Sequence, residues 1–125
     1  MTRIFKSKSF ARWMQHQGLL DINLIAAIAE MDTGKVDADL GGSVYKQRVA
    51  LPGRGKSGGV RTLIAYRHGA TAFFMFGFAK SERANVRAKE LRALKLAATV
   101  LLAKTGADLK KDLQAGILIE VGTNG

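Results

Sequence analysis

The chain has 125 residues, of which 47% are hydrophobic, with one proline and no cysteine. This length and composition suit one folded domain, and they exclude disulfides, thiolate metal sites and disorder over the whole length. His16 and His68 lie far apart in the sequence, and neither has an acidic cluster beside it. We therefore expect no metal site and no small-molecule cofactor.

The charge is concentrated in the middle of the chain. Twenty Lys and Arg residues against ten Asp and Glu give a net charge of +10. Residues 43–104 carry 13 bases and two acids, whereas residues 1–42 carry five of each. Such a field attracts polyanions, of which nucleic acid is the commonest in a cytoplasm. The alternative interpretation is a basic helix that is merely solvated.

Hydropathy gives no indication of a membrane protein. The longest apolar stretch lies within residues 96–103, far below the ~20 residues that a membrane span needs. No apolar segment follows the charged residues near the N-terminus. We expect a cytoplasmic protein without a membrane partner.

The first 34 residues predict a short strand and two helices. The strand covers residues 4–6, and apolar residues at helical spacing follow it up to a stop at Gly18. Ser9 is the expected N-cap of this first helix, and Asp21 that of a second helix ending at Gly34. We expect the two helices to form a hairpin.

Three β-rich segments follow, at Val44–Leu51, residues 60–67 and Thr71–Ala79. A glycine-rich connection, residues 52–59, joins the first two, and a short turn joins the last two. They predict an antiparallel meander. Residues 72–76 are apolar on both faces, which is typical of a central strand covered on each side.

The C-terminal part predicts a helix over residues 85–103, with one apolar and one basic face. Residues 108–115 favour a further short turn or helix, and residues 117–121 are strand-like. The expected architecture is α+β: an N-terminal helical hairpin packed on a small antiparallel β-sheet, with a C-terminal helix. We assign residues 1–104 to the main domain and residues 105–125 to an extension packed on it.

The glycine-rich connection resembles phosphate-binding loops but lacks their context. A P-loop or a dinucleotide fingerprint must open a helix, and here a strand follows. A kinase-type loop would need catalytic motifs that the chain does not contain. Backbone N–H groups beside Arg54 and Lys56 could still bind phosphate. The alternative is a flexible hairpin connection with no ligand.

Several cations are placed to act together. Lys46 and Arg48 are two residues apart on one strand, so both side chains project from the same face. Arg61 lies on the adjoining strand. Three further cations follow the third strand, namely Lys80, Arg83 and Arg87. Such a group could hold several consecutive phosphates.

This residue set is compatible with RNA cleavage. The ribose 2′-OH attacks its own phosphodiester once a base removes its proton and cations neutralise the pentacoordinate state. A lysine amine can act as that base, whereas an arginine can only stabilise charge. Phosphate binding without catalysis remains the alternative interpretation of the same residues.

Four segments together resemble the RelE/ParE toxin superfamily, most closely the RelE- or HigB-like toxins of type II toxin–antitoxin pairs. The resemblance covers about residues 1–103. The segments are residues 37–42 (Asp-Ala-Asp-Leu-Gly-Gly), residues 45–48 (Tyr-Lys-Gln-Arg), residues 52–62 (the glycine-rich connection with Arg61-Thr62) and residues 78–85 (Phe-Ala-Lys-Ser-Glu-Arg-Ala-Asn).

The resemblance implies that residues 1–104 form a RelE-like toxin domain. It also implies an mRNA-cleaving activity. RelE-type members cut mRNA in the ribosomal A site through a basic cleft, without metal, and leave a 2′,3′-cyclic phosphate. A cognate antitoxin protein blocks that cleft. Lys46 and Arg48 match the family's basic pair on a strand, and Arg61 matches its phosphate-binding arginine.

Two positions depart from the best-studied branch of the family. Its catalytic arginine after the third strand is replaced by Ser81, and its substrate-stacking tyrosine by Arg87. Arg83 is the expected replacement for the arginine. Tyr45 or Tyr66 could in principle replace the stacking group.

The sequence therefore predicts a ribosome-dependent mRNA endoribonuclease toxin. The predicted catalytic residues are Lys46, Arg48, Arg61 and Arg83, and the predicted phosphate-binding residues are Arg54, Lys56, Lys80 and Arg87. The predicted partners are mRNA on the ribosome and a cognate antitoxin. The alternatives are a ParE-like gyrase inhibitor and a non-catalytic nucleic-acid-binding protein.

Overall fold

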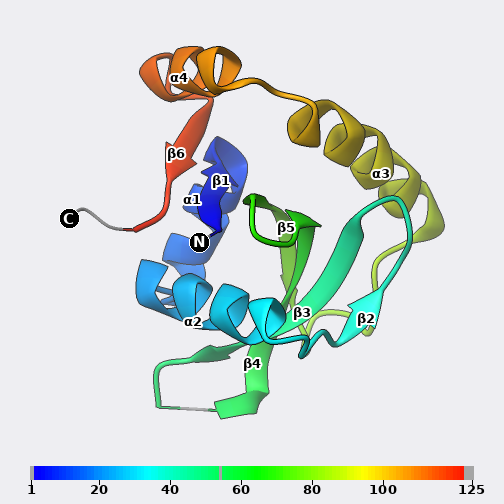
Figure 1. Cartoon of the computed structure of the whole chain (residues 1–125). Helices are drawn as coiled ribbons and strands as arrows, with labels where there is room; N and C mark the ends of the chain where they lie inside the picture. The colour runs from blue at the N-terminus through cyan, green and yellow to red at the C-terminus, as the bar shows by residue number, and fades with distance from the viewer. Residues whose placement is uncertain (1, 54, 123–125) are drawn as a thin grey trace.

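A computed structural model describes residues 2–53 and 55–122, without the side chains of residues 55–57. Figure 1 shows the course of the chain from an N-terminal strand to a C-terminal strand. The elements in order are β1 (Arg3–Ser7), α1 (Lys8–Gln17), α2 (Asp21–Asp32), β2 (Ala38–Asp39), β3 (Val44–Leu51), β4 (Gly55–Arg67), β5 (Thr71–Ala79), α3 (Ala88–Leu102), α4 (Gly106–Gln114) and β6 (Leu118–Glu120).

The described strands form one six-stranded mixed sheet in the order β2-β3-β4-β5-β1-β6. The central meander β3-β4-β5 is antiparallel, as expected. β1, however, pairs in parallel with β5, and β6 pairs antiparallel with β1. The expected architecture is therefore wrong. The chain begins with a strand that belongs to a larger mixed sheet, and two helices follow the meander.

The sequence could not predict this architecture because the strands that pair lie far apart along the chain. Ile4 of β1 lies opposite Ala72 of β5, a partner 68 residues away. Hydrophobic periodicity reports which residues of a segment are buried, but it does not report which distant segment they meet. A parallel pair also needs a long crossover. Here α1, α2 and the meander make up that crossover.

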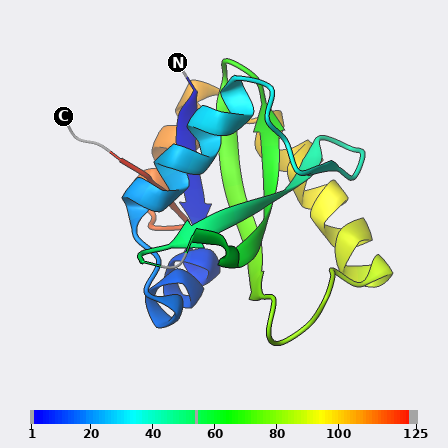
Figure 2. The ribbon, with the colours of Figure 1, turned by 90° about the horizontal axis from the view of Figure 1, so that it is seen from below.

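Helices cover both faces of the sheet (Figure 2). On one face, α1 and α2 pack through Phe10 and Leu24 onto residues such as Ile64 and Phe74. On the other, α3 and α4 form a second core, in which Ala98 packs with Phe73 and their neighbours. β5 lies inside the sheet and contributes to both cores, which explains why its sequence is apolar on both faces.

Two helix starts differ from the sequence-based expectations. The N-cap of α1 is Ser7, whose hydroxyl accepts a hydrogen bond from the backbone of Phe10, so Ser9 lies inside the helix. α2 has Leu20 as its N-cap, and Asp21 is its first helical residue. Two serines, Ser7 and Ser9, stand two residues apart here, and only the backbone conformation decides which one caps the helix.

The glycine-rich connection is shorter than expected because β4 already begins at Gly55. Leu51 pairs with Gly55, and the register shifts between Val49 and Leu51. Gly59 lies against this irregularity, where an added Cβ would be 2.1 Å from the carbonyl oxygen of Val49. Glycine is therefore required there by the close approach of two strands.

Among the described residues, none of the helices has both the length and the apolar character that crossing a membrane requires.

Candidate functional site

Three of the predicted cations occupy neighbouring positions of β3 and β4. Arg48 of β3 is the direct cross-strand partner of Arg61 of β4. Lys46 precedes Arg48 by two residues, and its partner Leu63 belongs to the α3-side core. Side chains two residues apart on a strand share a face, so the register gives Lys46, Arg48 and Arg61 same-face positions, and the three are here called the cationic group. Arg48 also borders a cavity that Asn23 and Ala26 of α2 line.

The pairing of Arg48 with Arg61 opposes stability, because like charges directly across two strands repel each other. The Nη1 atom of Arg61 is buried and has no hydrogen-bond partner within the described part of the chain. A buried, unpaired guanidinium nitrogen costs free energy. An anion bound at this point of the sheet would relieve both features.

Asp37 partly compensates this charge. Its Oδ2 accepts hydrogen bonds from the backbone N–H of Arg48 and, at 3.4 Å, from the Nε atom of Arg48. Its Oδ1 lies 3.4 Å from Nη2 of Arg48. The carboxylate therefore fixes the direction of the Arg48 side chain, 45% of which remains exposed.

Gln47 holds the segment that carries Asp37. Its side chain, 1% exposed, accepts a hydrogen bond from the backbone of Asp37 and donates one to the carbonyl of Lys35. Gln47 lies between Lys46 and Arg48 and projects from the opposite face of β3. One strand thus presents two cations on one face and anchors their neighbouring loop on the other.

The segment after β5, residues 80–87, reaches across to Lys46. The Lys46 Nζ atom lies 3.3 Å from Oδ1 of Asn85, and the same oxygen accepts a hydrogen bond from the backbone of Val86. Asn85 thus restrains a half-buried amine without adding a charge beside it.

Arg83 belongs to the same segment and contacts aromatic rings. Its Cζ atom lies 5.1 Å from the centre of the Phe76 ring and 5.2 Å from that of Phe78. Its Nη1 donates a 2.7 Å hydrogen bond to Glu90 of α3, which also accepts one from the backbone of Arg87. Two hydrogen bonds lower the pKa of Glu90. The one from the Arg83 side chain has the larger effect, and the one from the backbone of Arg87 has the smaller. Glu90 is therefore ionised at neutral pH.

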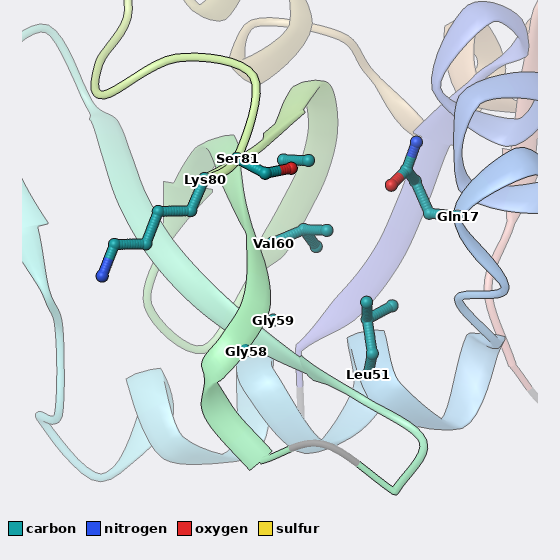
Figure 3. A pocket seen from close by; sticks show the side chains of 8 residues that line it. Gln17, Leu51, Gly58, Gly59, Val60, Lys80 and Ser81 are labelled. Carbon is teal, nitrogen blue, oxygen red and sulfur yellow. The ribbon is translucent and has the colours of Figure 1, made fainter.

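Of the predicted phosphate-binding residues, the two whose side chains the structure describes, Lys80 and Arg87, lie outside the cationic group. Arg87 is the exposed N-cap residue of α3. Lys80 is exposed in the turn after β5 and borders a cavity of about 460 Å³ that also touches Gln17 and Leu51. Figure 3 shows the Lys80 side chain directed away from that cavity, with Ser81 nearer to Gln17. Arg54 and the side chain of Lys56 lie outside the described residues.

Three residues beside the cationic group were missed from the sequence: Asp37, Asn85 and Glu90. Asp37 and Asn85 lie within the segments that carry the family resemblance, but no role follows from them alone. Glu90 stands three residues after Arg87, the spacing of a helix cap. Its contact with Arg83 depends on how the segment folds back. Within the described ranges, no three His, Asp or Glu side chains gather as a metal site would require.

The fold and site define a small basic α+β protein with arginine and lysine side chains gathered on one sheet face. A family model described as the RelE toxin of the RelE/RelB toxin–antitoxin system matches residues 2–121. The chain therefore belongs to the RelE toxin family, and its family partner is an antitoxin. A search of curated proteins found no match.

Proposed function

We propose that this protein is a ribosome-dependent mRNA endoribonuclease that needs no metal and that a cognate antitoxin holds inactive. The observation that carries the proposal is the cationic group, above all the cross-strand pair of Arg48 and Arg61, in which Nη1 of Arg61 has no hydrogen-bond partner among the described residues. RNA supplies both the anion that such a pair binds and the 2′-OH that cleavage requires.

The proposed chemistry gives each of the three side chains one role. Arg61 and Arg48 bind the two non-bridging oxygens of one phosphodiester, and they neutralise the charge that grows on its pentacoordinate state. Lys46 acts as the general base and takes the proton from the adjacent 2′-OH. The 2′-oxygen forms a bond to phosphorus while the bond to the 5′-oxygen breaks. Water protonates the departing oxygen, and the products end in a 2′,3′-cyclic phosphate and a 5′-OH.

Induced expression tests this function against the two alternatives. We expect growth arrest accompanied by truncated transcripts whose upstream fragments end in a 2′,3′-cyclic phosphate. Arrest with a DNA-damage response and intact transcripts would instead indicate a gyrase inhibitor. Binding of nucleic acid without arrest would leave only a non-catalytic binding protein.

Single substitutions test the assigned residues. Lys46→Ala or Arg61→Ala should abolish arrest and cut cleavage by at least about 100-fold, the usual contribution of one general base or one charge-stabilising group. Lys110→Ala removes the same charge from the exposed surface of α4 and should leave arrest unchanged. Circular dichroism verifies that each variant folds. Undiminished toxicity in folded Lys46→Ala and Arg61→Ala would contradict the proposed site.

A further inference from the structure

The outward face of α2 is apolar. Ile22, Ala26 and Ala29 follow one another at helical spacing on this face, and Ile25 lies beside them. All four are exposed, and 68% of Ile22 reaches solvent. A surface helix of a soluble protein normally carries polar or charged residues on its outer side. These four residues, here called the α2 stripe, form a helix face that no other part of the described chain covers.

α2 also differs from the other helices in charge. Of the four described helices, it alone has no Lys or Arg. Lys6 and Arg48 border hollows beside α2, but Lys6 is paired with Asp21 and Arg48 with Asp37. Because the chain carries a net charge of +10, two copies repel each other over most of their surfaces. At the α2 stripe, two copies can meet without bringing cations together.

A cavity beside the stripe offers room for an apolar side chain. It has a volume of about 390 Å³, and its mostly apolar lining includes Ile25 and Ala29 of α2 and Ile4 of β1. In an antiparallel pair of α2 helices with a two-fold axis between Ile25 and Ala26, Ile22 of each copy is level with Ala29 of the other. The most exposed side chain of the stripe then faces this cavity in both directions.

We propose that the α2 stripe joins two copies of this chain in a symmetric dimer. A two-fold axis requires a surface that complements itself, and the projecting Ile22 and the cavity beside Ala29 meet this requirement. RNA is not a suitable occupant because the stripe contains no cation. The acids of α2, namely Asp21, Glu30 and Asp32, disfavour an acidic partner. The inference goes beyond the proposed function and does not depend on it, since the stripe and the cationic group share no residue.

The dimer should be weak, and its salt dependence has a definite sign. The twelve residues of α2 span only about 18 Å, a short contact compared with stable interfaces, which bury at least about 1,200 Å². Raising the salt concentration from about 0.1 M to about 1 M shortens the screening length from about 10 Å to about 3 Å and weakens the repulsion between the two copies. Dimerisation should therefore strengthen with salt, whereas RNA binding weakens.

Sedimentation equilibrium of the purified full-length chain, up to millimolar concentration and at both salt concentrations, measures the association. Ile22→Glu should lower the association constant by at least about 100-fold, because each dimer would bury two unpaired carboxylates. Leu96→Glu is the matched control, since it makes the same change in charge at a 72% exposed apolar residue of α3. It should leave the association unchanged. Circular dichroism verifies that both variants fold.

Disulfide formation tests the same contact independently. The chain has no cysteine, so a single introduced cysteine can pair only with that of another copy. On mild oxidation, Ala26→Cys in the middle of the stripe should form linked dimers at least about tenfold faster than Ala93→Cys, another exposed alanine, on α3.

Four results would overturn the inference. The first is a chain that stays monomeric at the highest concentration in the higher salt. The second is association that Leu96→Glu abolishes and Ile22→Glu does not, which would indicate a contact through α3. The third is association that weakens with salt, which would indicate ion pairs. The fourth is an equal rate of disulfide formation in the two cysteine variants. None of these results bears on RNA cleavage.

Discussion

At the scale of single residues, the most constrained position on the α1 side is Gly77 of β5. A Cβ atom added there would be 2.3 to 2.8 Å from three ring atoms of Trp13. The indole of Trp13 thus lies directly on the backbone of β5, beyond the point where β1 ends its pairing at Phe74. Glycine at this position therefore allows Trp13 of α1 to pack directly on the backbone of β5.

We predict that Gly77→Ala lowers the free energy of unfolding by about 1–3 kcal/mol, the usual cost of adding a methyl group to a filled site. Urea denaturation measures this change. Gly106→Ala is the matched control. Gly106 is the first residue of α4 and has no atom within 4 Å of an added Cβ, so this variant should be as stable as the wild type or more so. Equal effects of the two substitutions would contradict the proposed contact.

The buried amide of Gln47 shows how one residue can serve the site without touching a substrate. It satisfies two backbone groups of the segment before β2 and thereby places Asp37 beside Arg48. From the sequence, Gln47 is only a polar residue between two cations. Its role becomes visible only when the loop is seen to fold back against β3.

At the scale of elements, α4 begins with a reciprocal cap. The Thr105 hydroxyl accepts a hydrogen bond from the backbone of Asp108, and Asp108 Oδ2 accepts one from the backbone of Thr105. Two hydrogen bonds with Thr105 lower the pKa of Asp108. The one with its backbone has the larger effect, and the one with its side chain has the smaller. The ionised carboxylate therefore stabilises the folded state.

This cap gives stability a pH dependence of known sign. The folded-state pKa of Asp108 lies below the unfolded value of about 3.9, so its contribution is fully present above that value and is lost as the pH falls through the folded pKa. We predict that Asp108→Asn flattens the fall in unfolding free energy on acidification below about pH 4. Urea titrations at a series of pH values measure this. A wild-type slope retained in the variant would disprove the assignment.

β1 and β6, which lie near the two ends of the chain, pair with each other. Leu118 is 4% exposed and belongs to the α3-side core, and β6 pairs with Phe5, Lys6 and Ser7 of β1. Arg3 adds a 2.9 Å salt bridge to Glu120, although both side chains are more than 40% exposed. Exposed ion pairs contribute little, so strand pairing and the burial of Leu118 supply most of this connection.

At the scale of the whole molecule, the net charge of +10 and the local cationic group have different effects on RNA binding. The overall charge speeds encounter with any polyanion and is screened by salt. A cation that directly contacts a phosphate displaces a counterion. It therefore sets how steeply the affinity falls with salt concentration.

We predict that Arg61→Gln reduces the slope of log affinity against log salt by about 0.7, the value for one phosphate contact on a single strand. Fluorescence anisotropy with a hexanucleotide of 2′-O-methyl uridine, which cannot be cleaved, measures the slope at several salt concentrations. Lys110→Gln changes the net charge equally but should leave the slope unchanged. If both variants shift the slope by the same amount, the charge acts diffusely and the cationic group is not a phosphate site.

The sequence alone was sufficient for the features that depend on neighbouring residues. The three strands of the meander, the four helical segments and the strand-like C-terminus follow from periodicities of two and 3.6 residues. Lys46 and Arg48 share a face because of the strand period, and the charge excess of residues 43–104 is a matter of counting. The family resemblance, which the match over residues 2–121 confirms, also rests on local segments.

Only the tertiary structure decided which distant segments meet. The sequence predicted a helical hairpin on a small antiparallel sheet. Because β1 pairs in parallel with β5, the structure instead has a six-stranded mixed sheet. The register that sets Arg48 opposite Arg61, and the fold of residues 80–87 that lays Arg83 over Phe76 and Phe78, were equally invisible in the sequence. Such pairings depend on a balance of burial and chain entropy over the whole molecule, which no local pattern records.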